Sequence, residues 1–112
     1  MATISIDGGV VTFINVFTCE PSNQQALIDT LVEETETTMR GLPGFLSANI
    51  HASEDGTRVC NYAQWTSMEA FQRLMSGDAG RQVIANVRRY ATDADIHLYR
   101  VAQTFGAPVA AK

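Results

Sequence analysis

The sequence of 112 residues lacks the features that mark several large classes of protein. Its eight Lys and Arg residues against twelve Asp and Glu residues give a net charge of −4, which disfavours a nucleic-acid groove or a polybasic membrane face. No apolar run approaches the ~20 residues that span a bilayer. The N-terminus lacks the basic and apolar stretches of a secretory signal. We therefore expect a cytoplasmic protein that binds neither nucleic acid nor membrane.

Motifs for cofactors, metals and hydrolysis are also missing. No glycine-rich phosphate loop occurs, so no nucleotide cofactor is implied. The two cysteines, Cys19 and Cys60, match no metal-binding spacing. Neither of the two histidines, His51 and His97, has a carboxylate at ligand spacing, and we predict no metal site. No Ser–His–Asp or Cys–His set has local support, which argues against hydrolytic chemistry.

What the sequence does contain is typical of one packed domain. Hydrophobic residues make up 46% of the chain and charged residues 18%, as in globular proteins. We treat residues 1–112 as a single domain with its core in about residues 10–104. Periodicity predicts strands that alternate in hydrophobicity and helices that repeat every three to four residues. The expected strands are 10–19, 45–52, 58–65 and about 95–104, with one helical region after the first strand and another after the third.

The order β-α-β-β-α-β predicts an α+β, ferredoxin-like fold, a four-stranded antiparallel sheet with helices on one face. Alternation divides the first strand into Phe13, Asn15 and Phe17 on one face and Thr12, Ile14, Val16 and Thr18 on the other. Neither set is charged, although a sheet with one wet face shows apolar–polar alternation. Because the helices cover only one face, we expect a second copy of the chain on the other, in a homodimer.

Residues 61–65 carry the main candidates for chemistry. Asn61 and Trp65 point to the same side of their strand. Trp65, the only tryptophan, taken alone is typical of a core aromatic. Burying a carboxamide in a strand costs about 1–3 kcal/mol unless it is paired, and Asn15 and Asn49 raise the same question in neighbouring strands. Three such amides indicate the wall of a small-molecule pocket, with polar points in an apolar surface.

Whether His51 and Asn49 join this wall depends on the hairpin that follows them. A three-residue loop at 54–56, which we favour, places Asn49 opposite Asn61 and His51 on the same face. A two-residue turn shifts the register by one residue and places Ile50 opposite Asn61 instead, which turns His51 to the other face.

The stretch PGFLSANIHASEDGTRVCNYAQWTS (residues 43–67) resembles the antibiotic biosynthesis monooxygenase family, in particular its cofactor-independent oxygenases that form quinones from anthrones in aromatic polyketide pathways. The Pro-Gly-Phe start, His-Ala-Ser before the turn and the Asn-Tyr-Ala-Gln-Trp strand carry the likeness. The resemblance implies a dimeric α+β barrel with one active site per subunit between sheet and helices, and no cofactor. It also implies that Asn61 and Trp65 lie near the reacting ring, with His51 as a lesser catalytic candidate.

In such chemistry a deprotonated phenol or anthrone itself reduces O2, so neither flavin nor metal is needed. The protein must hold the flat ring, stabilise the anion and exclude water. His51 is the expected proton acceptor, since its usual pKa is close to neutral. The expected substrate-binding residues are Phe13, Phe17, Asn15, Asn49, Phe71 and Arg81. Phe71 stands where similar members carry a tyrosine, and Arg88 competes with Arg81 for the family's third-helix arginine.

Alternative functions on the same fold are a general quinol oxidase and a non-catalytic ligand-binding or dimerisation module, because a fold alone does not fix function. A sister group degrades haem with an Asn in the first strand, a Trp in the third and a His in the second helical region. Asn15 and Trp65 fit that pattern, but no histidine occurs between Trp65 and Ala94, which disfavours haem degradation.

Overall fold

The computed structural model describes residues 2–6 and 8–108, so residues 1, 7 and 109–112 of the expected domain lie outside the described part. Its elements follow the predicted order. They are β1 (Val11–Cys19), η1 (Pro21–Asn23), α1 (Gln24–Glu34), η2 (Thr35–Met39), β2 (Phe45–Ala52), β3 (Arg58–Trp65), α2 (Met68–Ser76), α3 (Asp78–Arg88) and β4 (Ala91–Tyr99).

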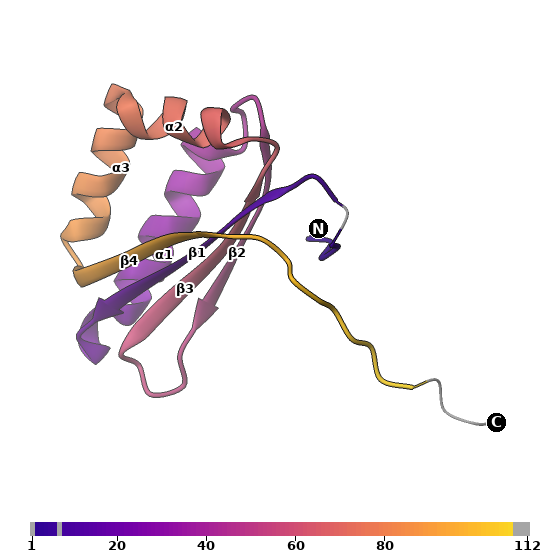
Figure 1. Ribbon diagram of the computed structural model, residues 1–112. Coiled ribbons are helices and arrows are strands. Elements are labelled where there is room, and N and C mark those ends of the chain that lie inside the picture. Colours follow the sequence, from indigo (N-terminus) through magenta and orange to yellow (C-terminus); the bar gives the residue numbers. More distant parts are fainter. Residues whose placement is uncertain (1, 7, 109–112) are drawn as a thin grey trace.

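The four strands form one antiparallel sheet in the order β2-β3-β1-β4. The three α-helices lie on one face of this sheet (Figure 1). The N-terminal segment and the tail after β4 extend away from the helices. This arrangement confirms the predicted ferredoxin-like fold. Within the described ranges, none of the helices has the length and apolar character needed to cross a membrane.

The last strand begins and ends earlier than predicted. Sequence alternation placed it at about residues 95–104, whereas β4 runs from Ala91 to Tyr99. Tyr99 pairs with Thr12, near the start of β1, so later residues have no neighbouring strand to pair with. At the other end the Thr92 hydroxyl donates to the carbonyl oxygen of Thr18. The limits of β4 are therefore set by the length of β1.

The hairpin between β2 and β3 has a longer loop than either predicted alternative. The Ser53 amide donates to the Arg58 carbonyl, which leaves four residues, 54–57, in the loop. The Asp55 carboxylate accepts bonds from the Ser53 hydroxyl and from both the amide and the hydroxyl of Thr57. These bonds, chiefly those from Thr57, lower the pKa of Asp55 to about 2. Ile50 consequently pairs with Asn61, so the favoured register is wrong and the alternative is confirmed.

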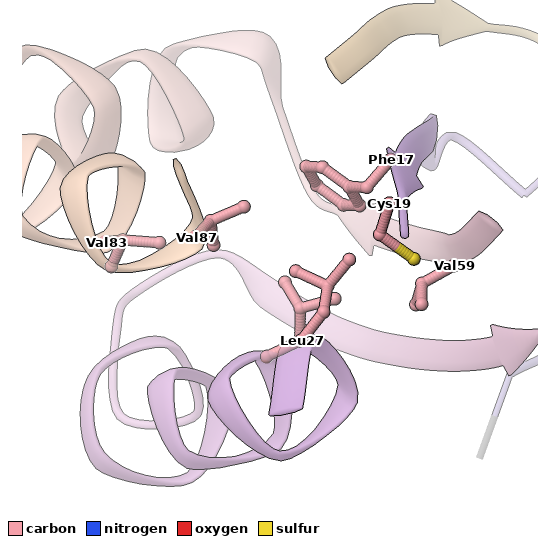
Figure 2. Packing of buried hydrophobic residues seen from close by; sticks show 7 residues of the cluster. Phe17, Cys19, Leu27, Val59, Val83 and Val87 are labelled. Carbon is pink, nitrogen blue, oxygen red and sulfur yellow. The ribbon is translucent and has the colours of Figure 1, made fainter. Parts of the chain in front are cut away.

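Two clusters of buried side chains form the core between the sheet and the helices. The first core cluster joins β1 and β3 to α1 and α3 (Figure 2) and consists of Phe17, Cys19, Leu27, Leu31, Val59, Val83 and Val87. The second core cluster joins the same strands to α2 and consists of Phe13, Ala63, Trp65, Ala70 and Leu74. On the strands, Asn15 and Asn61 separate the two clusters.

Candidate active site

A cavity of about 530 Å³ lies between the helices and the helix-facing side of the sheet. Its volume is in the range of small-molecule sites. The wall is mostly apolar and draws on β1, β3, β4 and all three α-helices. The lining residues are Asn15, Phe17, Leu31, Met39, Asn61, Ala63, Trp65, Phe71, Leu74, Met75, Val83, Ile84, Val87, Arg88, Ala91, Thr92, Asp93, Ala94 and Ile96.

Two buried asparagines form the polar part of the cavity floor. Asn15 in β1 and Asn61 in β3 are direct cross-strand partners, and they are 8% and 5% exposed. Directly opposite side chains in a sheet have Cβ atoms about 5 Å apart. Two carboxamides are thus held side by side beneath the cavity, and both belong to its wall as the sequence predicted.

The two amides differ in how their oxygens are used. Asn61 Oδ1 accepts a bond of 3.2 Å from the backbone amide of Asn49, which holds the side chain and leaves its Nδ2 end as a donor. Asn15 Oδ1 is buried and has no hydrogen-bond partner among the described residues. An unpaired buried acceptor costs about 1–3 kcal/mol. The floor therefore offers an acceptor on β1 beside a donor on β3.

An aromatic wall adjoins the asparagines. Trp65 is 1% exposed. Phe71 of α2 contacts Trp65 edge to face at a centroid distance of 5.9 Å and stacks on Phe13 at 3.9 Å. Phe45 also contacts Trp65 edge to face, at a centroid distance of 5.5 Å. Such contacts fix ring orientation. Phe17 and Phe71 line the cavity directly, whereas Phe13 supports Phe71 without lining it.

Arg88 is the only cationic side chain that lines the cavity within the described ranges. It shares that end of the cavity with Thr92 and Asp93 of β4. Arg81 is two turns earlier on α3, where it is exposed and bonded to Asp78 at 2.7 Å. Arg81 therefore does not line the cavity, contrary to its expected place in the substrate site, because the part of α3 that faces the cavity runs from Val83 to Arg88.

His51 and Asn49 do not join the Trp65 wall, and this part of the prediction is also wrong. In the observed register they pair with Cys60 and Tyr62, whose side chains lie on the sheet face opposite the cavity. His51 is exposed, with its Nδ1 3.0 Å from the Asn49 carbonyl oxygen. Asn49 Nδ2 donates to the Tyr62 carbonyl. Neither side chain reaches the cavity of its own subunit.

Met39 and Arg88 are two of the lining residues that were not among the predicted site residues, although Arg88 was considered as an alternative to Arg81. Arg88 follows Ile84 by four residues and so shares its helix face, a signal that also fits Arg81. Helical spacing puts Met39 in the apolar stripe of its helix, but its place in the cavity wall depends on an irregular helical turn. Within residues 2–6 and 8–108, no three His, Cys, Asp or Glu side chains are grouped to hold a metal ion.

Comparison with known proteins identifies the family. Residues 10–86 match the family model described as antibiotic biosynthesis monooxygenase. The chain belongs to this family. It is also 50% identical over 78 residues to the tetracenomycin-F1 monooxygenase of Streptomyces glaucescens, a match that covers 70% of this chain and 69% of that protein. The resemblance seen at residues 43–67 is thereby confirmed, and the chain is a monooxygenase.

Solved structures of family members have the same fold. A monooxygenase from the gene ActVA-Orf6 of Streptomyces coelicolor, in complex with nanaomycin D, superposes with a TM-score of 0.80 at 25% identity and covers 90% of this chain and 96% of its own. SnoaB, a cofactor-independent oxygenase from Streptomyces nogalater, superposes with a TM-score of 0.67 at 24% identity and covers 88% and 98%. The antibiotic biosynthesis monooxygenase fold therefore extends over most of the chain.

Proposed function

We propose that this monooxygenase oxidises a polycyclic phenol or anthrone of the aromatic polyketide type to a quinone, using O2 and no cofactor. The observation that carries the proposal is the pair of buried asparagines beneath an aromatic-walled cavity. The 50% identity to a tetracenomycin-F1 monooxygenase supports the substrate class. A flat ring system fits between Trp65, Phe71 and the sheet floor.

In this mechanism Asn15 positions a ring hydroxyl that stays protonated, and Asn61 favours the anion of the substrate. Asn15 Oδ1 accepts the hydrogen of a ring hydroxyl, which satisfies its unpaired acceptor. Asn61 Nδ2 donates to the oxygen that becomes negative, and its fixed position stabilises charge where it develops. Because His51 lies on the other face, the proton passes to water at the open side of the cavity.

The substrate anion then supplies the electrons for O2 reduction. One electron passes to O2, the resulting pair combines, and a carbon–oxygen bond forms at the ring methylene carbon to give a hydroperoxide. Loss of water from this group leaves the quinone carbonyl. The balance is one methylene and one O2 giving one carbonyl and one H2O, so one oxygen atom enters the product. Buried aromatic walls keep bulk water from the anion during these steps.

Turnover of a dihydroxyanthrone by protein dialysed against a chelator tests the function. We expect quinone formation in air well above the protein-free rate, with one labelled oxygen per quinone under isotopically labelled O2. Activity that requires added flavin or iron contradicts the mechanism. A quinol oxidase forms quinone without incorporating label, and a binding module quenches Trp65 fluorescence without turnover, so these two alternatives give different results.

We assign Arg88, rather than Arg81, to the binding of an anionic substituent at the far end of the substrate. Arg88 forms no ion pair among the described residues, although it lines the cavity. For a carboxylated anthrone we expect Arg88→Gln to raise KM about tenfold with little change in kcat, since a charge-assisted bond contributes about 1.5–3 kcal/mol. Arg81→Gln, on the same helix outside the cavity, is the control. An equal rise in KM for a neutral anthrone contradicts this assignment.

The opposite sheet face supports the proposed homodimer. Ile14, Val16 and Tyr62 on this face are only half-buried in the single chain, and Tyr99 is 47% exposed. A second sheet packed on this face removes that apolar surface from water. Light scattering on the sample used for turnover gives the mass that decides between one chain and two.

A further inference from the structure

The helical segment after β1 ends in an unusual wide turn beside the cavity. In η2, the Arg40 amide donates to the Thr35 carbonyl, five residues back, over 2.9 Å. This is the bond of a π-helix, a rare form that occurs mostly as single turns and often at functional sites. The turn adds one residue to the helical path between α1 and the loop that precedes β2.

The extra residue decides which side chain faces the cavity. In a regular α-helix of about 3.6 residues per turn, Thr38 would lie above Leu31 and Met39 about a quarter of a turn aside. In the structure, Met39 lines the cavity together with Leu31, and Thr38 does not. The wide turn thus replaces a hydroxyl with a flexible thioether at this point of the wall.

Met39 lies at the boundary between the two halves of the core. It packs against both the first and the second core cluster. Asn15 and Asn61 separate the same clusters on the sheet side. Met39 therefore approaches from the helix side toward the part of the sheet that carries the asparagine pair, and it forms a roof above that floor.

We propose that Met39 is a specificity-determining residue, which sets the size of the ring system that the site accepts. This inference rests on the proposed function, because a ring held by the asparagine pair must pack beneath Met39. A methionine side chain has several rotatable bonds and adapts to the ring it covers. Its removal deepens the cavity above the reacting ring, which loosens a small substrate and makes room for a larger one.

The test compares Met39→Ala and Met39→Leu with the control Met68→Ala. Met68 is also half-buried and packs against the second core cluster, but it does not line the cavity. Substrates are a tricyclic hydroxyanthrone and a tetracyclic homologue with the same hydroxyl groups. For Met39→Ala we expect the tetracyclic-to-tricyclic ratio of kcat/KM to rise at least about tenfold, since the small substrate loses apolar contact with the methionine side chain while the larger one fills the space left. Met39→Leu keeps the wild-type ratio within about threefold because it conserves volume.

If the tetracyclic-to-tricyclic ratio of kcat/KM is the same in Met39→Ala as in Met68→Ala, the inference is overturned while the proposed function stays intact. Binding gives an independent measurement, because Trp65 is the only tryptophan and lies in the cavity wall. Quenching of its fluorescence by dihydroxyanthraquinone reports Kd without turnover. This measurement also covers the case in which the wild-type protein oxidises neither substrate. In that case a Kd raised about tenfold in Met39→Ala and unchanged in Met68→Ala still supports the packing of Met39 on the bound ring. An unchanged Kd in both variants overturns it.

Discussion

Replacing Asn61 with alanine is expected to lower kcat for a hydroxyanthrone about a hundredfold or more, the effect of removing one fixed donor from a developing anion. The buried Asn61 side chain is held through its Oδ1 by the Asn49 amide, so its Nδ2 is oriented before substrate binds. Water that enters the space left by alanine has no such fixed orientation. Steady-state kinetics in air, corrected for spontaneous oxidation, measure the loss.

The pH dependence separates this role from a structural one. If Asn61 stabilises the substrate anion, its removal raises the pKa of the bound hydroxyl, and activity in Asn61→Ala recovers as pH rises. Disturbed packing alone lowers activity equally at every pH. Asn86→Ala is a suitable control, since Asn86 lies on α3, outside the cavity wall, where it bonds to Glu34. A pH profile that keeps its wild-type shape contradicts the proposed role.

Replacing Asn15 with leucine is expected to stabilise the fold while it abolishes most of the activity. Leucine is close to asparagine in shape, and it removes the one buried side-chain oxygen that lacks a partner among the described residues. We expect the free energy of unfolding to rise by about 1–2 kcal/mol. Turnover is expected to fall about a hundredfold, because the acceptor that positions the substrate hydroxyl is lost. Chemical denaturation and steady-state kinetics measure the two effects.

Asn61→Leu is the matched control for the direction of this change in the free energy of unfolding. The two asparagines are cross-strand partners with similar burial, but leucine at position 61 leaves the Asn49 amide without its acceptor. We therefore expect Asn61→Leu to lower the free energy of unfolding by about 1–2 kcal/mol. Opposite signs for the same substitution on neighbouring strands identify Asn15 as an acceptor kept for its ligand. Destabilisation in both variants contradicts this interpretation.

Sequence periodicity predicted the fold and part of the site, because both depend on which face a residue occupies. An alternation of two residues placed Asn61 and Trp65 on the same side of β3, and Asn15 on the same side of β1 as Phe13 and Phe17, as the structure has them. These placements do not depend on loop geometry. Any error in the loops leaves the strand faces of β1 and β3 unchanged.

Other site residues depend on details that no periodic pattern contains. His51 and Asn49 were misplaced because Asp55 binds Thr57 and draws it into the loop, which shifts β2 by one residue relative to the favoured register. Arg81 and Arg88 are seven residues apart and share a helix face, so sequence alone did not decide which end of α3 meets the cavity. The strand register differs by one residue and the two arginines by two helical turns, and tertiary contacts determine which arrangement forms.

The cavity also has a consequence for folding thermodynamics. It divides the core into two clusters, so a domain of 112 residues folds around a hollow of about 530 Å³. A ring system that fills the hollow gives both clusters a common packing partner and binds only the native state. By mass action, a ligand at a hundred times its Kd adds about 2.7 kcal/mol to the free energy of unfolding. We therefore expect the protein without its ligand to unfold, and to be cleaved by a protease, sooner than the occupied protein.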